Sequence, residues 1–146
     1  MQPINFDFLK YLNNRNKRGE TPLLLGCRVG SNNCLPLLLS KGASLLIPSL
    51  ENKLAYEYCQ DEFIKKTLKY LTRCELQLLA DLGCDILKHK ELLESTENQI
   101  NNNIDDNTCK QVMKLFCAYV KSPDSEIFDI SKAAISFAMF KRGLIK

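Results

Sequence analysis

The fold is restricted most strongly by a short stretch at residues 18–30, RGETPLLLGCRVG. A glycine can take a positive φ in a turn, and proline fits the first turn of a helix, where its missing N–H needs no partner. Thr21 is a residue type that caps helices, Pro22 would occupy the first helical position, and Gly30 is typical of a helix end. The stretch therefore predicts a turn at Gly19 followed by a helix of about two turns, which is too short to be stable alone.

A second short helix is predicted directly after the first, in SNNCLPLLLSKGAS, residues 31–44. Asn33 is its expected N-cap, Pro36 lies within its first turn, and Gly42 is its expected end. Its expected apolar face consists of Cys34, Leu35, Leu38 and Leu39. Because both helices are short, they are expected to pack antiparallel against each other and against neighbouring elements.

The pattern returns along the chain in a weaker form. Asn52 takes the place of Gly19, and asparagine is the next best residue for a left-handed conformation. The sequence KLAYEYC then stands where ETPLLLG stood. Residues 76–87, LQLLADLGCDIL, match residues 35–46, LPLLLSKGASLL, with Gly83 as the expected helix end. The first of these matches predicts a degenerate repeat whose period is the separation of Gly19 and Asn52, whereas Gly83 follows Gly42 at a longer separation, so we expect an insertion or a rebuilt segment between them.

The first copy of the pattern resembles an ankyrin repeat. The matching positions are Gly19-x-Thr21-Pro22-Leu23, the small pair Gly26-Cys27, Gly30 and LLLSKGAS at residues 37–44. This resemblance implies an all-α fold, a short and irregular solenoid of helix-turn-helix pairs without a sheet. Its hairpin loops are expected near residues 15–20 and 47–53, and C-terminal helices are expected to close it.

The sequence departs from the family pattern at two places. Leu24 stands where the family has a histidine after Thr-Pro-Leu, so the hydrogen bonds of that histidine are lost. The second copy has Leu54-Ala55-Tyr56 in place of Thr-Pro-Leu. We therefore expect an irregular stack in which the second unit is less regular than the first.

We expect a single ankyrin-repeat domain, residues 1–146. Its parts are a partial repeat or N-terminal cap at 1–15, the best repeat at 16–48, degenerate repeats at 49–87, and a helical C-terminal cap at 88–146. Apolar spacing predicts two helices in this cap, at residues 108–121 and 130–142. Residues 5–14 look like the second helix of a repeat whose first helix is absent, so we expect the chain to be a fragment of a longer protein.

The composition argues against the common catalytic and metal sites. His89 is the only histidine and stands between Lys88 and Lys90, where we expect it to be exposed. A Cys–His pair, a zinc site or a Ser–His–Asp set would have to be built around that one residue. The glycines form no phosphate-binding loop. We therefore expect no enzymatic activity, no cofactor and no metal in this chain.

Cysteine usage, hydropathy and charge restrict the expected cellular compartment and the expected classes of partner. The seven cysteines are odd in number and contain no C-x-x-C pair, so we expect seven reduced and mostly buried thiols in a reducing cytosol. The sequence has no run of 18 apolar residues and no export signal, and we expect no membrane contact. The net charge of +3 is far from that of a typical nucleic-acid binder. When free, the chain is expected to be a monomer.

The ankyrin resemblance implies that a protein partner binds to the hairpin tips and to the exposed side of the first helices. The corresponding residues are Lys17, Arg18, Glu20, Arg28 and Val29 in the first copy, and Leu50, Glu51, Lys53, Asp61 and Glu62 in the second. One edge is basic and the next is acidic, and Leu50 is a candidate apolar anchor. The basic cluster at residues 13–19 is explained equally well as a solvated turn without a function.

The sequence favours a non-catalytic protein-interaction module. A short degenerate stack closed by extra helices, in a chain rich in Asn, Ile, Leu and Lys, resembles the C-terminal ankyrin domain of the OspC family of bacterial type III secretion effectors. That resemblance implies secretion into the host cytosol, binding of a host inflammatory caspase such as caspase-4 or caspase-11, and inhibition of pyroptosis. An NAD-dependent ADP-riboxanase domain would then lie outside this chain.

Three alternatives remain open at this point. The chain also fits a poxvirus-type ankyrin host-range protein, although residues 108–146 show no obvious F-box-like tail. It equally fits a general eukaryotic ankyrin adaptor. Nucleic-acid binding is the weakest alternative, because Glu51, Asp61 and Glu62 would interrupt a basic surface.

Overall fold

The computed structural model describes residues 11–81, 106–122 and 130–141. The regular elements in these ranges are all helical, and the all-α prediction is confirmed for them. In chain order they are α2 (Pro22–Val29), the 3-10 turn η1 (Asn32–Cys34), α3 (Leu35–Ser40), the 3-10 turn η2 (Ala55–Tyr58), α4 (Glu62–Asp81), α6 (Asp106–Val120) and α7 (Ile130–Lys141).

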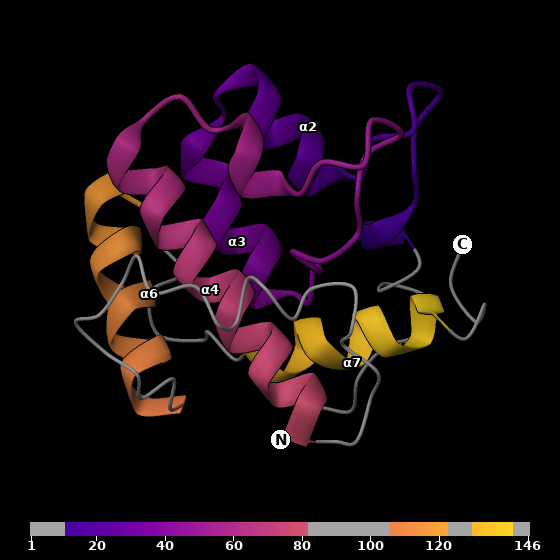
Figure 1. Ribbon diagram of the computed structural model, residues 1–146. Coiled ribbons are helices and arrows are strands. Elements are labelled where there is room, and N and C mark those ends of the chain that lie inside the picture. Colours follow the sequence, from indigo (N-terminus) through magenta and orange to yellow (C-terminus); the bar gives the residue numbers. More distant parts are fainter. Residues whose placement is uncertain (1–10, 82–105, 123–129, 142–146) are drawn as a thin grey trace.

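Helix α4 forms the centre of the molecule, and the other elements lie around it (Figure 1). Its buried side chains recur at helical spacing, as at Ile64, Leu68 and Leu71, so one face of the helix is apolar. α4 contacts η2, α6 and α7, while α2 packs between η2 and α3. The core therefore joins the two short N-terminal helices to the C-terminal ones through α4.

Two hairpin turns lie at the predicted positions. Their backbone N–H groups donate to carbonyl oxygens from Asn16 to Glu20 (2.8 Å), Gly19 to Asn16 (2.9 Å), Ser49 to Lys53 (2.9 Å) and Asn52 to Ser49 (2.9 Å). Gly19 has a φ of 75° and Asn52 a φ of 62°, so both residues are left-handed. The two turns have the same geometry at equivalent positions of the two copies, and both predicted hairpins are confirmed.

Helix α2 begins and ends as its sequence predicts. The hydroxyl oxygen of Thr21 accepts a hydrogen bond from the backbone N–H of Leu24 at 3.2 Å, and Pro22 is the first helical residue. Gly30 has a φ of 79°, and its N–H donates to the carbonyl of Gly26. The N-cap, the first-turn proline and the left-handed glycine together fix this helix at eight residues.

The start of the second helix differs from the prediction. Asn33 lies inside η1 and is not an N-cap, and α3 begins only at Leu35 without a side-chain cap. Cys34 is exposed, whereas Leu35 and Leu39 are buried. The reason is that the 3-10 turn has a different residue spacing from an α-helix, which leaves residues 33 and 34 on the outside.

The second copy of the pattern has only one 3-10 turn, η2, where the first copy has α2. Leu54 lacks the hydroxyl of Thr21, and its backbone N–H donates instead to the carboxylate of Glu57 at 2.6 Å. α4 then runs for 20 residues without a break. The third match, at 76–87, therefore begins inside α4, and Gly83 lies outside the described residues.

The two helices expected near the C-terminus are present as α6 and α7. α6 buries Met113, Phe116 and Cys117, and α7 buries Ala133 and Ala134. Because alanine is small, α7 can approach closely, and it contacts both α4 and α3. The division of the chain into repeats and a cap remains a prediction.

A buried polar cluster connects α4 to the segment after α3. One carboxylate oxygen of Glu75 accepts a hydrogen bond from the Ser44 hydroxyl (2.7 Å), and the other accepts one from the Leu45 N–H (3.0 Å). Asn13 accepts a hydrogen bond from the Ser44 N–H (3.1 Å) and donates one to the hydroxyl of Ser136 in α7. Burial raises the pKa of Glu75 to about 7, although both of its hydrogen bonds act in the opposite direction.

The expectation of seven reduced cysteines is wrong at Cys74. This residue is buried in α4 and forms a disulfide. Cys27, Cys34, Cys59 and Cys117 are thiols, and Cys34 alone of these four is exposed. The spacing of the cysteines could not exclude such a bond, because folding brings together cysteines that are far apart in sequence.

Candidate binding surface

The two hairpin tips touch each other through Leu50. A β-carbon placed on Gly19 would overlap with Cγ of Leu50, so this side chain lies directly against the backbone of Gly19. Leu50 nevertheless remains 74% exposed. One tip therefore covers the backbone of the other and still presents an apolar side chain to solvent.

The predicted contact residues divide according to their exposure. Eight of the ten are exposed, namely Lys17, Arg18, Arg28, Val29, Leu50, Glu51, Lys53 and Glu62. Asp61 is half-buried and Glu20 is buried. All of the exposed residues except Glu62 lie at the two tips or at the end of α2. Asp61 and Glu62 lie at the start of α4. Their contact with a partner remains a prediction.

Glu20 is held by Arg28 instead of facing solvent. Nε of Arg28 donates to one carboxylate oxygen at 2.5 Å, and Nη2 donates to the other at 3.2 Å. The hydrogen bonds from Arg28 hold the pKa of Glu20 below its ordinary value, although burial opposes the shift. This bidentate pair ties the first tip to the last turn of α2.

The second tip is closer to neutral than the first. Nζ of Lys53 lies 3.8 Å from a carboxylate oxygen of Glu51 and 5.8 Å from the ring centroid of Tyr58. Lys17 and Arg18 of the first tip form no ion pair with any described residue. The first tip therefore carries the larger uncompensated positive charge.

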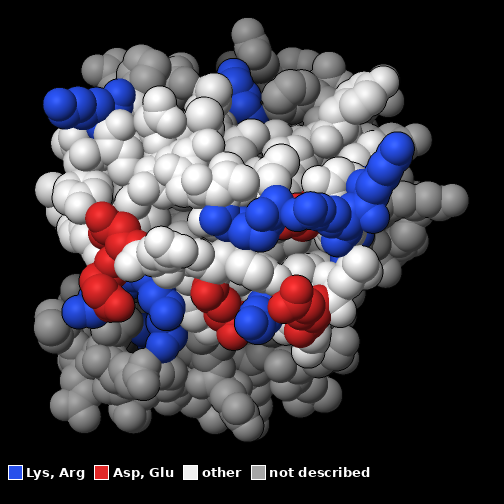
Figure 2. Space-filling model, turned by 90° about the horizontal axis from the view of Figure 1, so that it is seen from above, with Lys and Arg blue, Asp and Glu red and all other residues white. Residues whose placement is uncertain are grey.

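The charges form two rows on the face seen from above the view of Figure 1. Figure 2 shows one row of basic side chains across this face and, beside it, a row in which acidic and basic side chains alternate. The row beside the basic one is mixed in charge, and the division into a basic edge and an acidic edge remains a prediction.

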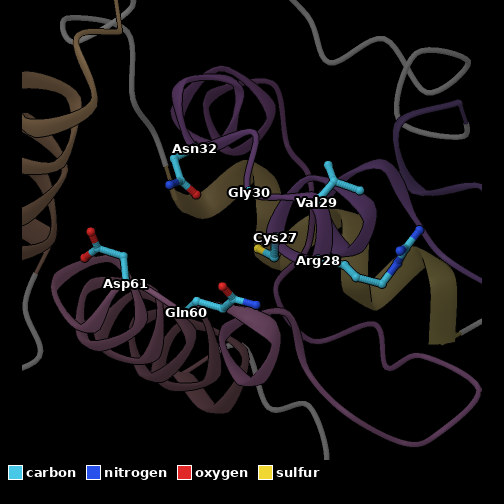
Figure 3. A pocket seen from close by; sticks show the side chains of 7 residues that line it. All are labelled: Cys27, Arg28, Val29, Gly30, Asn32, Gln60 and Asp61. Atoms are coloured by element: carbon cyan, nitrogen blue, oxygen red, sulfur yellow. The ribbon is translucent and has the colours of Figure 1, made fainter.

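A cavity of about 290 Å³ opens beside the end of α2 (Figure 3). The residues that line it are Cys27, Arg28, Val29, Gly30, Asn32, Gln60 and Asp61. In the close view, Asn32 reaches in from one side, and Gln60 and Asp61 reach in from the segment that leads into α4. The guanidinium of Arg28 points away from these three polar side chains.

Asp61 caps α4 and connects it to α6. One carboxylate oxygen accepts the N–H groups of Phe63 (2.9 Å) and Ile64 (3.1 Å), and the other accepts the hydroxyl of Tyr119 (2.8 Å). The ring of Tyr119 lies against that of Phe63, with centroids 4.4 Å apart. The hydrogen bond from Tyr119 is the main cause that lowers the pKa of Asp61, which is therefore ionised at neutral pH.

Cys27, which lines the cavity, interacts with a second thiol, Cys59. The interaction between the Cys27 and Cys59 thiols raises the pKa of Cys27 and lowers that of Cys59, and the Cys59 thiol donates to the carbonyl of Ala55 at 3.8 Å. Cys27 belongs to α2, and Cys59 directly follows η2. The two thiols thus lie where α2 packs against η2.

The sequence predicted Arg28, Val29 and Asp61 as contact residues but predicted no cavity. Gln60 follows Cys27 at the separation that Asn52 has from Gly19, so the repeat itself was a signal that the two residues share a surface. Asn32 and Tyr119 were missed, and a separation of 58 positions between Asp61 and Tyr119 leaves no local signal for their contact.

The described residues contain no group of three or more His, Cys, Asp or Glu side chains that could hold a metal ion. No helix within the described ranges is long and apolar enough to cross a bilayer. His89, Lys88 and Lys90 lie outside these ranges. The absence of enzymatic activity and of a cofactor remains a prediction.

Comparison with known proteins gives one partial match. Over 43 residues the chain is 42% identical to the Start control protein cdc10 of Schizosaccharomyces pombe, which contains ankyrin repeats. The match covers 30% of this chain and 6% of cdc10. No protein-family model matches the chain, and no solved structure gives a significant match. The partial match points to the ankyrin family and leaves the OspC-type resemblance without support from these comparisons.

Proposed function

We propose that this chain is a non-catalytic ankyrin-type module that binds a protein partner through its two-tip surface. This surface consists of Lys17, Arg18, Val29, Leu50, Glu51 and Lys53. Leu50 is the observation that carries the proposal, because it is 74% exposed and yet fixed against Gly19. An exposed leucine alone is ordinary, but one that is already ordered loses less conformational entropy when a partner covers it.

The charges of the first tip favour an acidic partner. Lys17 and Arg18 are exposed and form no ion pair with the described residues, so an incoming carboxylate displaces no internal partner. Exposed charges of this kind mainly increase the association rate, and salt screens them over about 10 Å. Leu50 and Val29 are instead suited to slow dissociation through burial.

The OspC-type resemblance supplies a specific partner for this proposal, the processed protease domain of a host inflammatory caspase. The module would bind it in the host cytosol without NAD and leave it chemically unmodified. The support for this version is architectural, since short repeats are followed by α6 and α7, which pack against α4.

The test measures binding of the purified caspase protease domain to the immobilised chain, with mass measurement of the caspase afterwards. Leu50→Asp should raise the dissociation rate at least about tenfold, which corresponds to the loss of a buried anchor. K17E/R18E should slow association and weaken its salt dependence. K114E/K121E changes the same number of charges on and directly after α6, which lies on the opposite side from the tips, and should have no effect (Figure 1).

Arg28 is left unchanged in this test, because a carboxylate at that position would stand against buried Glu20. If the caspase does not bind, the caspase version is discarded. The same variants are then tested on a partner purified from host lysate and identified by mass spectrometry. If only K114E/K121E loses binding of that partner, the two-tip surface is not the binding surface.

A further inference from the structure

The cavity beside α2 shares only Val29 with the two-tip surface and has a chemistry of its own. We propose that it is a binding pocket for a single arginine side chain of a protein partner. The inference rests on the proposed function only for the source of that arginine, because recognition of a guanidinium group can be tested on the chain alone.

The charge of the lining selects a cation. Of the seven lining residues, two are charged, Arg28 and Asp61. Arg28 is neutralised by its bidentate pair with Glu20, and its guanidinium points away from the polar wall (Figure 3). The carboxylate of Asp61 is thus the uncompensated charge of the lining. The carbonyl end of α2 faces the same cavity, and the helix dipole adds partial negative charge there.

The number of free acceptors favours a guanidinium group. A carboxylate can accept about four hydrogen bonds, and Asp61 already accepts three, so it can take one more. The side-chain amides of Asn32 and Gln60 make no hydrogen bond with the described residues, and each can turn a carbonyl oxygen toward the cavity. Three acceptors around one space suit the five N–H donors of arginine better than a point charge.

An exposed aromatic pair adjoins the carboxylate. Phe63 is 41% exposed and Tyr119 is 51% exposed, although their rings contact each other. The Tyr119 hydroxyl donates to Asp61, so the aromatic pair lies directly beside the carboxylate. The apolar stem of an arginine, or a neighbouring apolar residue of the partner, could cover these rings while the guanidinium enters the cavity.

The size of the cavity limits the occupant. A volume of about 290 Å³ lies just below the range of roughly 300–1,000 Å³ that is typical for small-molecule sites. The cavity can hold one long side chain with some water, but not a large cofactor. Gly30 forms part of the rim, and a β-carbon there would meet nothing within 4 Å, so the entrance is open.

The test uses the full chain and two neutral-backbone probes, N-acetyl-arginine amide and N-acetyl-citrulline amide. Citrulline has nearly the same shape as arginine but no charge, and it therefore isolates the contribution of the guanidinium. Binding is followed by 1H–15N NMR, with the side-chain amides of Asn32 and Gln60 as local reporters. The arginine probe should shift these signals in a saturable way, and the citrulline probe should not.

The variant D61N removes the charge but keeps a good N-cap for α4, since asparagine caps helices as well as aspartate does. It should weaken the arginine probe about tenfold, which is the effect expected from losing one charged hydrogen bond. E62Q removes a neighbouring exposed charge that does not line the cavity, and it should change the affinity less than about twofold.

Equal binding of citrulline and arginine, or equal effects of D61N and E62Q, would overturn the pocket proposal. Shifts confined to other parts of the chain would overturn it as well. None of these results depends on a partner. The pocket can therefore fail while the two-tip surface still captures a protein, and it can bind arginine even if no protein binds the tips.

Discussion

The first unit, residues 16–48, and the second, residues 49–81, share their hairpin turn but differ in their helices. At the turn, Gly19 is replaced by Asn52, and both residues take the left-handed conformation. The side chains before them also correspond, since Asn16 and Ser49 each accept backbone N–H groups of their own turn. A turn tolerates this exchange because asparagine can adopt a positive φ at modest cost.

Replacements at the helix start and at the helix end, in contrast, change the helices of the second unit. Leu54 replaces the capping Thr21, and the second unit forms a single 3-10 turn where the first has α2. Glu75 replaces Gly42, and α4 continues where α3 has already ended. The difference between the two units therefore lies in the residues that start and end a helix, and not in the residues that form the turn.

The largest effect on stability is expected from Glu75→Gly, which introduces into α4 the glycine that ends the corresponding helix of the first unit. A glycine inside a helix costs about 1 kcal/mol, and the buried Ser44 hydroxyl and Leu45 N–H would lose their acceptor, at about 1–3 kcal/mol each. The free energy of unfolding, measured with urea at pH 5, should fall by about 4 kcal/mol. Gln77→Gly in the same helix should cost only about 1 kcal/mol. Equal losses in both variants would show that Glu75 does not hold the loop.

The pH dependence of the same residue gives the next largest effect. The folded-state pKa of Glu75 is about 7, above the value of 4.5 in the unfolded chain, so the folded state holds the proton more tightly. The stabilisation is complete below pH 4.5 and is lost as the pH rises to about 7. Relative to E75Q, the free energy of unfolding should fall by about 3 kcal/mol across this window. Parallel pH profiles of the two proteins would contradict the prediction.

The turn is tested by Gly19→Val against Asn52→Gly. Valine at a positive φ is strained by about 1–3 kcal/mol, and its β-carbon would also meet Leu50. We expect a loss of about 2 kcal/mol in urea unfolding. Asn52→Gly should stay within about 0.5 kcal/mol, because glycine accepts the same φ. A large loss in Asn52→Gly would mean that the two turns are not equivalent.

The smallest effect concerns the cap that distinguishes α2 from η2. Thr21→Ala removes the hydrogen bond to the Leu24 N–H and should cost about 1 kcal/mol, with faster amide exchange in the first turn of α2. Ser31→Ala is the matched control, because Ser31 makes no side-chain cap bond to η1. It should change stability by only a few tenths of a kcal/mol. If both variants behave alike, the hydroxyl of Thr21 does not account for the difference between the units.

The parts of the fold that depend on residues adjacent in sequence could be predicted. The turn at Gly19 and the start of α2 at Thr21 and Pro22 follow from local backbone preferences, and the structure confirms them. The early start of a 3-10 turn at Asn32 was not predictable in this way, because α and 3-10 turns use similar residues.

The candidate site was less predictable than the fold. The ankyrin resemblance placed Glu20 among the contact residues, but Arg28 at the end of α2 pairs with its carboxylate and Glu20 is buried. The contact of Asp61 with Tyr119 depends on how α4 packs against α6, and neither sequence segment encodes that packing by itself. Side-chain pairs between separate elements are therefore the part that sequence patterns leave open.

The position of Glu75 has a consequence for how such a protein could grow. A solenoid lengthens by copying its unit, and each copy must turn back at the same place before the next can be added. The first unit turns back at Gly42, whereas the second continues in α4 to Asp81, and its Glu75 is bonded to the loop that follows the first return. A design that adds units after residue 81 would first have to replace residues 75–81 with residues 42–48. The same replacement would remove the acceptor of the Ser44 hydroxyl and the Leu45 N–H, so the residue that stands in place of Gly42 also secures the loop after Gly42.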